Sequence, residues 1–390
     1  MLTFYILLLG SLLFGTLTGI SIKPGVVAYA HDFVLVSGII FLGIRQWRQR
    51  KKSTKAPPLM RPMVLFLSAG VISLVANVGS FGVADLFTSS LYLWRWAAYA
   101  CLYVLFVRSA IPVSTLLGHL FTFGLVFGVV GIAQFFLYPN LRFLMYMGWD
   151  PHYYRLFSTL LDPNFAGIIL VLSTFLGYHL YVTQKKPWIL AAVVLLVVCV
   201  YLTYSRSSYL ALGFGMIIYG MLKKQFAVLG LLFALAAIII YVPRPGGDTL
   251  RLWREDSTYS RFSNWKESSE LFLKSPVVGH GFNTLRLIQT PVYTGGVVYT
   301  SHAAGGVDSS ILFLLVTSGV LGLVAYVYLL YSAGRFGDPA KKEQVSVKQL
   351  YIVSISAVFM HSFFVNSLFY PWVMVWMWVI VSAVELTFDR

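Results

Sequence analysis

The chain has little acidic charge, few cysteines and no motif for a cofactor. Only 14 of its 390 residues are Asp or Glu, and all charged residues together make up 11%. A soluble domain is usually about a quarter charged, so this composition argues against one. The two cysteines, Cys101 and Cys199, fall inside apolar stretches and do not indicate a disulfide framework or a metal site. Since no Walker, Rossmann or zinc motif occurs, we expect no nucleotide cofactor and no bound metal.

What the chain has instead is apolar stretches of membrane-spanning length. Hydrophobic residues make up 58% of the sequence, and the mean hydropathy is +0.78. The pattern predicts one all-α polytopic membrane domain over residues 1–390. Residues 2–22 are too long and lack the basic start of a cleaved signal, so we interpret them as the first span. The twelve predicted spans are 2–22, 26–45, 62–80, 88–107, 112–137, 164–184, 188–204, 207–222, 226–243, 309–331, 351–368 and 370–387.

The formal charge of +15 comes from basic residues that cluster in loops. In a soluble protein this charge would suggest nucleic acid, but in a membrane protein Lys and Arg gather on cytoplasmic loops. The clusters at 45–61, 185–186, 223–224 and 335–348 all agree with one topology. We therefore predict that both termini are cytoplasmic and that nucleic acid is not a partner.

Three polar segments then fall on the outer face. They are the aromatic loop 138–163, the turn 204–208, and the extracytoplasmic loop 244–308. Within the last loop, Phe262, Trp265, Ser269 and Phe272 recur near helical spacing, which predicts a helix near 258–274 lying along the membrane surface.

Two arginines are candidates for binding an anion. Arg206 is flanked by apolar spans and by serines, which favours an anion site over an arginine that merely snorkels to the interface. Arg261 opens the predicted surface helix and could clamp a phosphate bidentately, or it could contact lipid headgroups. Arg286 lies further along the same loop, and nothing around it distinguishes the two roles.

Candidate proton acceptors lie close to the tenth span. Asp308 could simply cap the helix that follows, or it could accept a proton from a substrate hydroxyl. His302 is a second candidate base, in a looser setting. Asp162, followed by Pro and Asn, is typical of the residue at which a helix starts, and it precedes the sixth span. Asp32 and Arg95 lie within predicted spans. They could form an ion pair, lie at the membrane interface or belong to a transport path, and the sequence does not decide between these three roles.

These features favour a membrane enzyme that acts on a lipid-linked phosphate. Two other classes compete with it: a transporter or flippase of a lipid-linked or anionic solute, and a non-catalytic scaffold. Transporters often show related halves, whereas the polar residues of this chain are concentrated in one outer loop, which favours the enzyme.

Four short segments in this order resemble the O-antigen ligase and polysaccharide polymerase superfamily. They are RLFSTLLDPNFAG (155–167), TYSRSSYLAL (203–212), SRFSNWKESSELFLKSPVVGHGF (260–282) and DSSILFLLVTSGVLGL (308–323). The resemblance implies a GT-C-like glycosyltransferase in the bacterial cytoplasmic membrane, with its active site outside. Such enzymes move a glycan from an undecaprenyl-diphosphate carrier to a glycan, lipid or protein acceptor, and they look metal-independent and inverting.

The resemblance also implies roles for particular residues. Arginines hold the diphosphate, loop glycines support it, and a residue near the acceptor acts as base. Ligases typically carry a His-Asn pair where this chain has Asp308-Ser309, and His302 is out of register, which favours a polymerase. A protein partner that regulates chain length is left open. The implied site comprises Asp308, Arg206, Arg261 and His302 as catalytic residues, Arg155, Gly279 and Gly281 as further diphosphate ligands, and Trp265, Tyr154 and Asn164 as sugar or lipid contacts.

Overall fold

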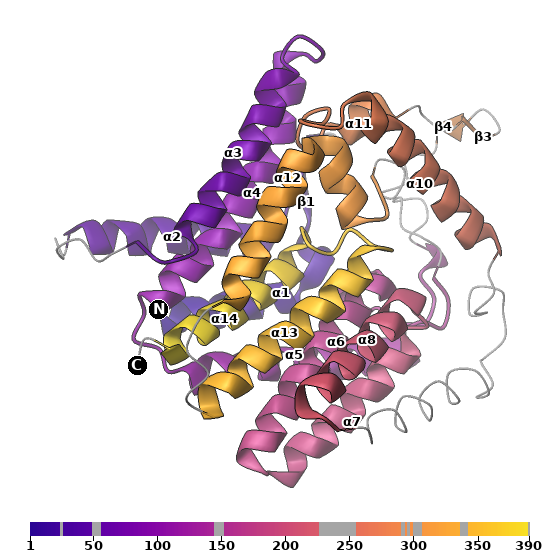
Figure 1. Ribbon diagram of the computed structural model, residues 1–390. Coiled ribbons are helices and arrows are strands. Elements are labelled where there is room, and N and C mark those ends of the chain that lie inside the picture. Colours follow the sequence, from indigo (N-terminus) through magenta and orange to yellow (C-terminus); the bar gives the residue numbers. More distant parts are fainter. Residues whose placement is uncertain are drawn as a thin grey trace.

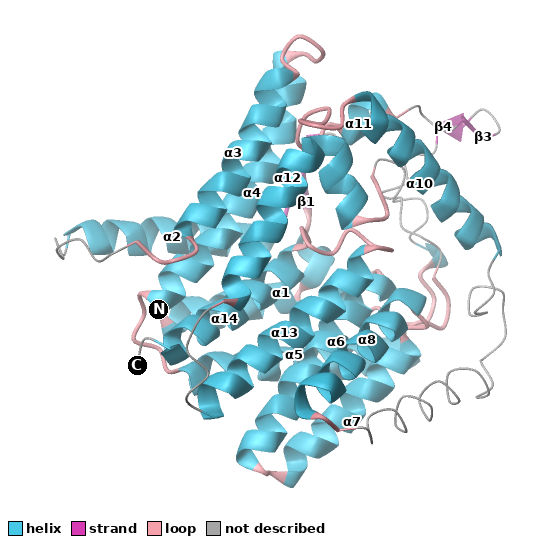
Figure 2. Ribbon diagram, in the orientation of Figure 1, coloured by secondary structure: helices cyan, strands magenta, loops and turns pink. Residues whose placement is uncertain are grey.

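The structure is a computed structural model, and it is largely helical (Figure 2). It describes residues 1–23, 26–48, 56–143, 152–225, 255–289, 293–294, 297–298, 306–335 and 342–388. The α-helices are α1 (Leu2–Leu13), α2 (Ala30–Arg48), α3 (Met60–Ala76), α4 (Val83–Val107), α5 (Val113–Leu137), α6 (Pro163–Gln184), α7 (Pro187–Leu202), α8 (Arg206–Lys223), α10 (Glu255–Lys274), α11 (Leu285–Ile288), α12 (Ser310–Gly334), α13 (Lys342–Ser362) and α14 (Pro371–Phe388). Short elements are the 3-10 turns η1 (Gly15–Thr18) and η3 (Ser158–Leu160) and the strands β1 (Ile20–Lys23), β2 (Val26–Ala28), β3 (Tyr293–Thr294) and β4 (Val297–Val298).

Five of the described helices are long and apolar enough to cross a membrane: α4, α5, α6, α12 and α14. Shorter apolar helices include α1, α3 and α7, together with the first part of α2. A polytopic, all-α membrane protein accounts for this set. The predicted ninth span, 226–243, lies outside the described residues, so the number of twelve spans stays a prediction.

Helix α14 forms the centre of the bundle. Every residue from Pro371 to Leu386 is buried, because α4, α5, α6 and α13 pack around this helix. The indole of Trp372 donates a hydrogen bond to the Leu12 carbonyl oxygen at 2.9 Å, which ties α14 to the end of α1. Figure 1 shows both termini at the left of the view and α10 along the opposite edge.

The predicted first span, 2–22, is wrong in its second half. Helix α1 ends at Leu13, and residues 20–23 form an antiparallel pair with β2 instead. The cause is Gly15, which has a φ of 61° and lies against the backbone of Thr159, where a Cβ atom would be only 2.1 Å from the carbonyl oxygen. Only glycine fits there comfortably, since other residues are strained at positive φ. The helix therefore stops, and the chain turns into the hairpin.

Helix α12 is broken at Gly319, whose φ of 64° and ψ of −168° are not helical. The break allows the segment 276–281 to approach closely, since a Cβ atom on Gly319 would lie 2.2 Å from the Val277 oxygen. Backbone hydrogen bonds join the two segments: the amides of His280 and Gly281 donate to α12 carbonyls at 2.9 and 3.1 Å. The first half of α12 is thus held by the loop that follows α10, and α10 itself packs on α12.

Candidate active site

A tight turn between α7 and α8 presents Arg206. Ser205 caps α8 by accepting the backbone N–H of Ser208, and Tyr204 adopts a left-handed φ of 48°. The buried guanidinium of Arg155 holds the turn from the other side, with Nε donating to the Thr203 oxygen at 2.9 Å and Nη2 to the Tyr204 oxygen at 3.2 Å. Arg155 therefore supports the backbone that carries Arg206, and its predicted contact with the diphosphate stays a prediction.

A chain of buried side chains lies behind this turn. Ser205 Oγ donates to Asn164 Oδ1 at 2.9 Å and lies 3.0 Å from Ser207 Oγ. Ser207 is 3.0 Å from Nε2 of His361, whose Nδ1 is 2.6 Å from Ser367 Oγ. Both serines of the turn and His361 are almost fully buried. A fully satisfied network of this kind restricts side-chain positions, so the start of α8 is fixed against α6 and α13.

The helix predicted near 258–274 is present as α10, and one of its faces contributes to the candidate site. Its place along the membrane surface stays a prediction. Arg261, Asn264 and Trp265 are three and four residues apart, which places them on one side of a helix. Asn264 Nδ2 donates to the Gly306 oxygen at 3.1 Å, and the Asp308 amide donates to Asn264 Oδ1 at 3.2 Å. Asn264 thereby holds the segment that carries Asp308 next to the face that carries Arg261.

Asp308 does not cap α12. The cap is Ser309, whose hydroxyl accepts the Leu312 N–H and donates to the Ser362 oxygen at 3.1 Å. Of the two roles that the sequence leaves open for Asp308, the helix cap is therefore wrong, because the cap is the next residue. Although the Asp308 side chain is partly exposed, burial of the remainder raises the pKa of its carboxyl group; Arg261 opposes this rise and Asp162 adds to it.

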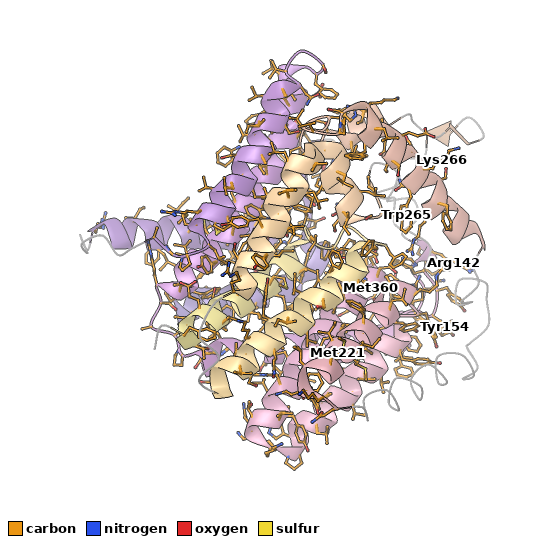
Figure 3. All side chains as sticks on the ribbon, viewed as in Figure 1. Arg142, Tyr154, Met221, Trp265, Lys266 and Met360 are labelled. Carbon is orange, nitrogen blue, oxygen red and sulfur yellow. The ribbon has the colours of Figure 1, made fainter. Side chains whose placement is uncertain are left out.

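Arg206 and Arg261 line the same cavity, which has a volume of about 220 Å³. Phe262, Trp265 and Phe364 form its apolar wall. The indole N–H of Trp265 is buried and has no hydrogen-bond partner among the described residues. Figure 3 labels Trp265 and Lys266 on α10; Lys266 is exposed and does not line the cavity. A buried donor without a partner is uncommon in proteins and requires a cause; a bound acceptor atom would satisfy it.

The two arginines repel each other across this cavity. Burial lowers the pKa of Arg206, and the charge of Arg261 lowers it further. Two guanidinium groups that converge on a partly buried space are stabilised when an anion lies between them. The geometry is therefore suited to holding a phosphate-type group with a carboxylate, Asp308, within electrostatic reach.

Asp162 and Asn164 have the helix-start role expected from their sequence. The Asp162 carboxylate accepts the amides of Asn164 and Phe165 at 2.6 and 3.3 Å, so it caps α6. The Asn164 side chain points to Ser205 and connects the cap to the turn with Arg206. Its predicted contact with sugar or lipid is not excluded by this bond and stays a prediction.

The remaining predicted residues are distributed around the site. Gly279 and Gly281 have positive φ values and donate their amides to the Ser275 and Thr317 oxygens, so they hold the loop against α12 and do not line the cavity. Their role in diphosphate binding stays a prediction. Tyr154 is half-buried, with its ring 4.5 Å from that of Tyr153. His302 lies outside the described residues.

Asp32 and Arg95 form the ion pair that was one of the alternatives. Arg95 Nε donates to Asp32 Oδ1 at 2.9 Å, and Nη2 donates to the other carboxylate oxygen. Tyr99 also donates to this carboxylate, and the Arg95 guanidinium lies 5.4 Å from the centre of the Tyr29 ring.

Sequence reasoning missed two residues of the site, His361 and Asn264. His361 lies in an apolar stretch with no ligand spacing around it, and only the fold brings it to Ser207. Asn264 had a usable signal, because it lies one turn after Arg261 on the same helix face.

Three residues of the candidate site lie in a segment of the chain that matches a protein-family model. A protein-family model described as O-antigen ligase matches residues 191–327, about a third of the chain, and this range contains Arg206, Arg261 and Asp308. No curated protein matches the chain. Residues 191–327 are thus similar to the O-antigen ligase family, and this match supports the resemblance seen in the sequence.

Proposed function

We propose that this protein is a polysaccharide polymerase of the bacterial cytoplasmic membrane. It transfers a glycan from an undecaprenyl-diphosphate carrier to a second lipid-linked saccharide on the outer face, with both termini cytoplasmic. The observation that carries the proposal is the convergence of Arg206 and Arg261 on one cavity, with Asp308, a carboxylate that the helix cap does not use, within electrostatic reach of Arg261. The family match supports the reaction class.

The chemistry follows from the charges. A hydroxyl oxygen of the acceptor attacks the anomeric carbon of the donor sugar, the bond from that carbon to the phosphate oxygen breaks, and its electron pair leaves with the diphosphate. Arg206 and Arg261 stabilise the charge that develops on the leaving group, which is the largest single contribution in many enzymes. In-line attack inverts the anomeric centre, and the arginines supply the charge that a metal ion supplies elsewhere.

Asp308 accepts the proton of the attacking hydroxyl. A carboxylate with a raised pKa is a better base than an ordinary one, since proton-transfer efficiency follows basicity. Arg261 opposes this rise in the pKa, whereas burial and Asp162 sustain it. Asn264, through its bond to the Asp308 amide, fixes the base relative to the arginine on the same helix.

The apolar wall of the cavity suits the rest of the donor. Phe262 and Phe364 lie beside the arginines, where the first isoprene units of the carrier would follow the diphosphate into the membrane. Trp265 offers a ring face to the first sugar and an indole N–H to a phosphate or hydroxyl oxygen.

The test uses purified protein in detergent with a lipid-diphosphate-linked oligosaccharide and EDTA. Lengthening of the glycan on its lipid supports a metal-independent polymerase. If no ladder forms but glycan is transferred to a lipid A–core or protein acceptor, the enzyme is instead a ligase or protein O-oligosaccharyltransferase. If nothing reacts while the lipid crosses the bilayer of liposomes, a flippase replaces the enzyme hypothesis.

A further inference from the structure

A second cavity lies where α6, α8 and α13 pack against one another, away from the first cavity, which Arg206 lines. Its polar lining comes from all three helices: Tyr178 and His179 on α6, Tyr219 and Lys223 on α8, and Ser346 and Gln349 on α13. None of these residues lines the first cavity. Figure 3 labels Met221, two residues before Lys223, well below Trp265 of the first cavity.

The same three helices carry the candidate active site at their other ends. The stretches that separate the two regions are Arg206–Lys223 in α8, Asn164–His179 in α6 and Ser346–His361 in α13. At a rise of 1.5 Å per residue, each stretch measures about 22–26 Å. The second cavity therefore lies at one end of a three-helix unit whose opposite end positions Arg206.

The described lining of the second cavity carries a cation and hydrogen-bond donors but no carboxylate. Lys223 supplies the ammonium group. Ser346 Oγ lies 3.3 Å from Nδ1 of His179, and a neutral imidazole has one donor and one acceptor nitrogen. If the serine donates, the other ring nitrogen keeps its N–H; if the ring donates, the serine keeps its O–H. In either tautomer the pair retains one hydrogen to donate, so the cavity favours an anion.

The size of the cavity limits what can enter it. Its volume is about 30 Å³, which is room for roughly two water-sized groups, so it suits phosphate oxygens and excludes a saccharide. The polar side chains around it are partly exposed, so a ligand can reach it from the surface of the bundle. The rest of the lining is apolar and comes from Phe175, Val182, Leu350 and Val353. Such a lining suits the hydrocarbon that follows a lipid headgroup.

A buried acceptor in the lining indicates that the ligand also carries a donor. The amide oxygen of Gln349 is buried and has no hydrogen-bond partner among the described residues. A bare anion cannot donate to this oxygen, whereas a headgroup with hydroxyl groups can. Basic pockets between membrane helices on the cytoplasmic side bind anionic lipid headgroups. The predicted topology puts this end of α6 and α8 there, with the basic clusters at 185–186 and 223–224.

We propose that the second cavity binds the headgroup phosphate of an anionic phospholipid with headgroup hydroxyls, such as phosphatidylglycerol. Lys223 pairs with the phosphate, the His179–Ser346 pair donates to one of its oxygens, and the acyl chains follow the apolar lining. The lipid joins the ends of α6, α8 and α13, and its binding stabilises the unit whose other end carries Arg206. This role is separate from the glycan that the enzyme transfers.

Native mass spectrometry of the purified full chain tests the site, with phosphatidylglycerol and phosphatidylcholine of the same acyl chains as probes. The wild-type protein is expected to retain phosphatidylglycerol in preference. Lys223→Gln weakens this binding about tenfold, the range for a lost hydrogen bond to a charged group. Lys224→Gln is the matched control, because Lys224 also lies at the end of α8 but is exposed and does not line the cavity. It is expected to bind as the wild type does.

Thermal unfolding gives a second readout. Phosphatidylglycerol is expected to raise the unfolding temperature of the wild type and of Lys224→Gln, to raise that of Ser346→Ala less, and to leave that of Lys223→Gln unchanged. Equal retention of both lipids, or equal losses in the two lysine variants, overturns the inference. If inorganic phosphate alone gives the same rise through Lys223, the site takes a free anion and the lipid assignment falls. Neither measurement involves glycan transfer, so a failure here leaves the proposed polymerase function standing.

Discussion

Arg95 and Arg261 both belong to a mostly apolar protein, yet their charges have different partners. Arg95 donates two hydrogen bonds to Asp32 and lies over the ring of Tyr29, so its charge is neutralised inside the fold. Arg261 instead faces a second guanidinium, that of Arg206, across a cavity. The difference gives a rule that can be tested in a membrane protein: a cation with a built-in counter-ion is structural, and we propose that a cation that converges with like charge on a cavity binds a ligand.

The largest effect on activity is expected at the converging pair. Arg261→Ala lowers the rate of glycan transfer by about 10²–10³-fold, the usual effect of removing one group that stabilises developing charge. Arg261→Lys restores part of this rate because the charge remains without the bidentate geometry. The measurement is transfer by purified protein, with thermal unfolding as control; an unchanged rate would remove Arg261 from the mechanism.

Asp308 is tested against its neighbour. Asp308→Asn lowers the transfer rate by roughly 10²–10⁴-fold, as expected for loss of a general base, and leaves the unfolding temperature unchanged. Ser309→Ala has the opposite profile, because it removes the α12 cap and costs about 1 kcal/mol of stability. Equal destabilisation by both variants would contradict the assignment of the cap to Ser309.

Replacing Arg95 is expected to lower the stability of the fold, whereas replacing Arg261 is expected to lower the transfer rate. Arg95→Ala leaves the Asp32 carboxylate largely buried and without its counter-ion, which destabilises the fold by roughly 3 kcal/mol. Asp32→Asn combined with Arg95→Met recovers much of this loss, since neither charge then remains. Thermal unfolding in detergent measures both variants, and a stable Arg95→Ala protein would show that the ion pair does not hold α2 to α4.

A smaller effect is expected at His361, which contacts Ser207, the residue next to Arg206. His361→Ala removes two hydrogen bonds and loosens the start of α8, so we expect the maximal rate to fall about tenfold, within the range for a misplaced group. His361→Asn keeps one of the bonds and recovers part of the rate. A fall in thermal stability with an unchanged rate would make the network purely structural.

The smallest effect concerns pH. Because the pKa of Asp308 is raised, its ionised fraction, and with it the rate, declines as the pH falls through that raised value rather than at the ordinary value of a carboxyl group. Asp162→Asn keeps the α6 cap, since Asn is an equally good cap, but removes a charge that raises this pKa. The acid limb of the pH–rate profile then moves to lower pH; an unmoved limb would contradict Asp308 as the titrating base.

Much of the helical layout follows from hydropathy alone. The predicted spans 112–137 and 164–184 differ by one residue from α5 and α6, because apolar stretches flanked by Pro and polar residues define their own ends. The first span failed because its end depends on Gly15 meeting Thr159, a contact between residues distant in sequence.

In the candidate site, too, some features follow from the local sequence and others depend on contacts between distant segments. Arg206, Arg261 and Asp308 were predicted from local features and from resemblance, and the structure brings them around one cavity or within electrostatic reach. The uses of Gly279, Asn264 and His361 depend on the break in α12 and on helix packing. For Asn264 the spacing from Arg261 gives the helix face but not its partners, and for Gly279 and His361 no local pattern encodes the contacts, so these contacts become visible only in three dimensions.

The break at Gly319 has a consequence for how the protein responds to its bilayer. Helices tilt when the hydrocarbon layer is thicker or thinner than their apolar length. In α12, backbone hydrogen bonds join both sides of the break to the 276–281 segment: the amides of His280 and Gly281 donate to α12 before Gly319, and the amides of Val320 and Leu321, after it, donate to the segment. The break at Gly319 is therefore bridged by one segment, and we expect α12 and the 276–281 segment to move as a unit when the acyl-chain length of the lipid changes.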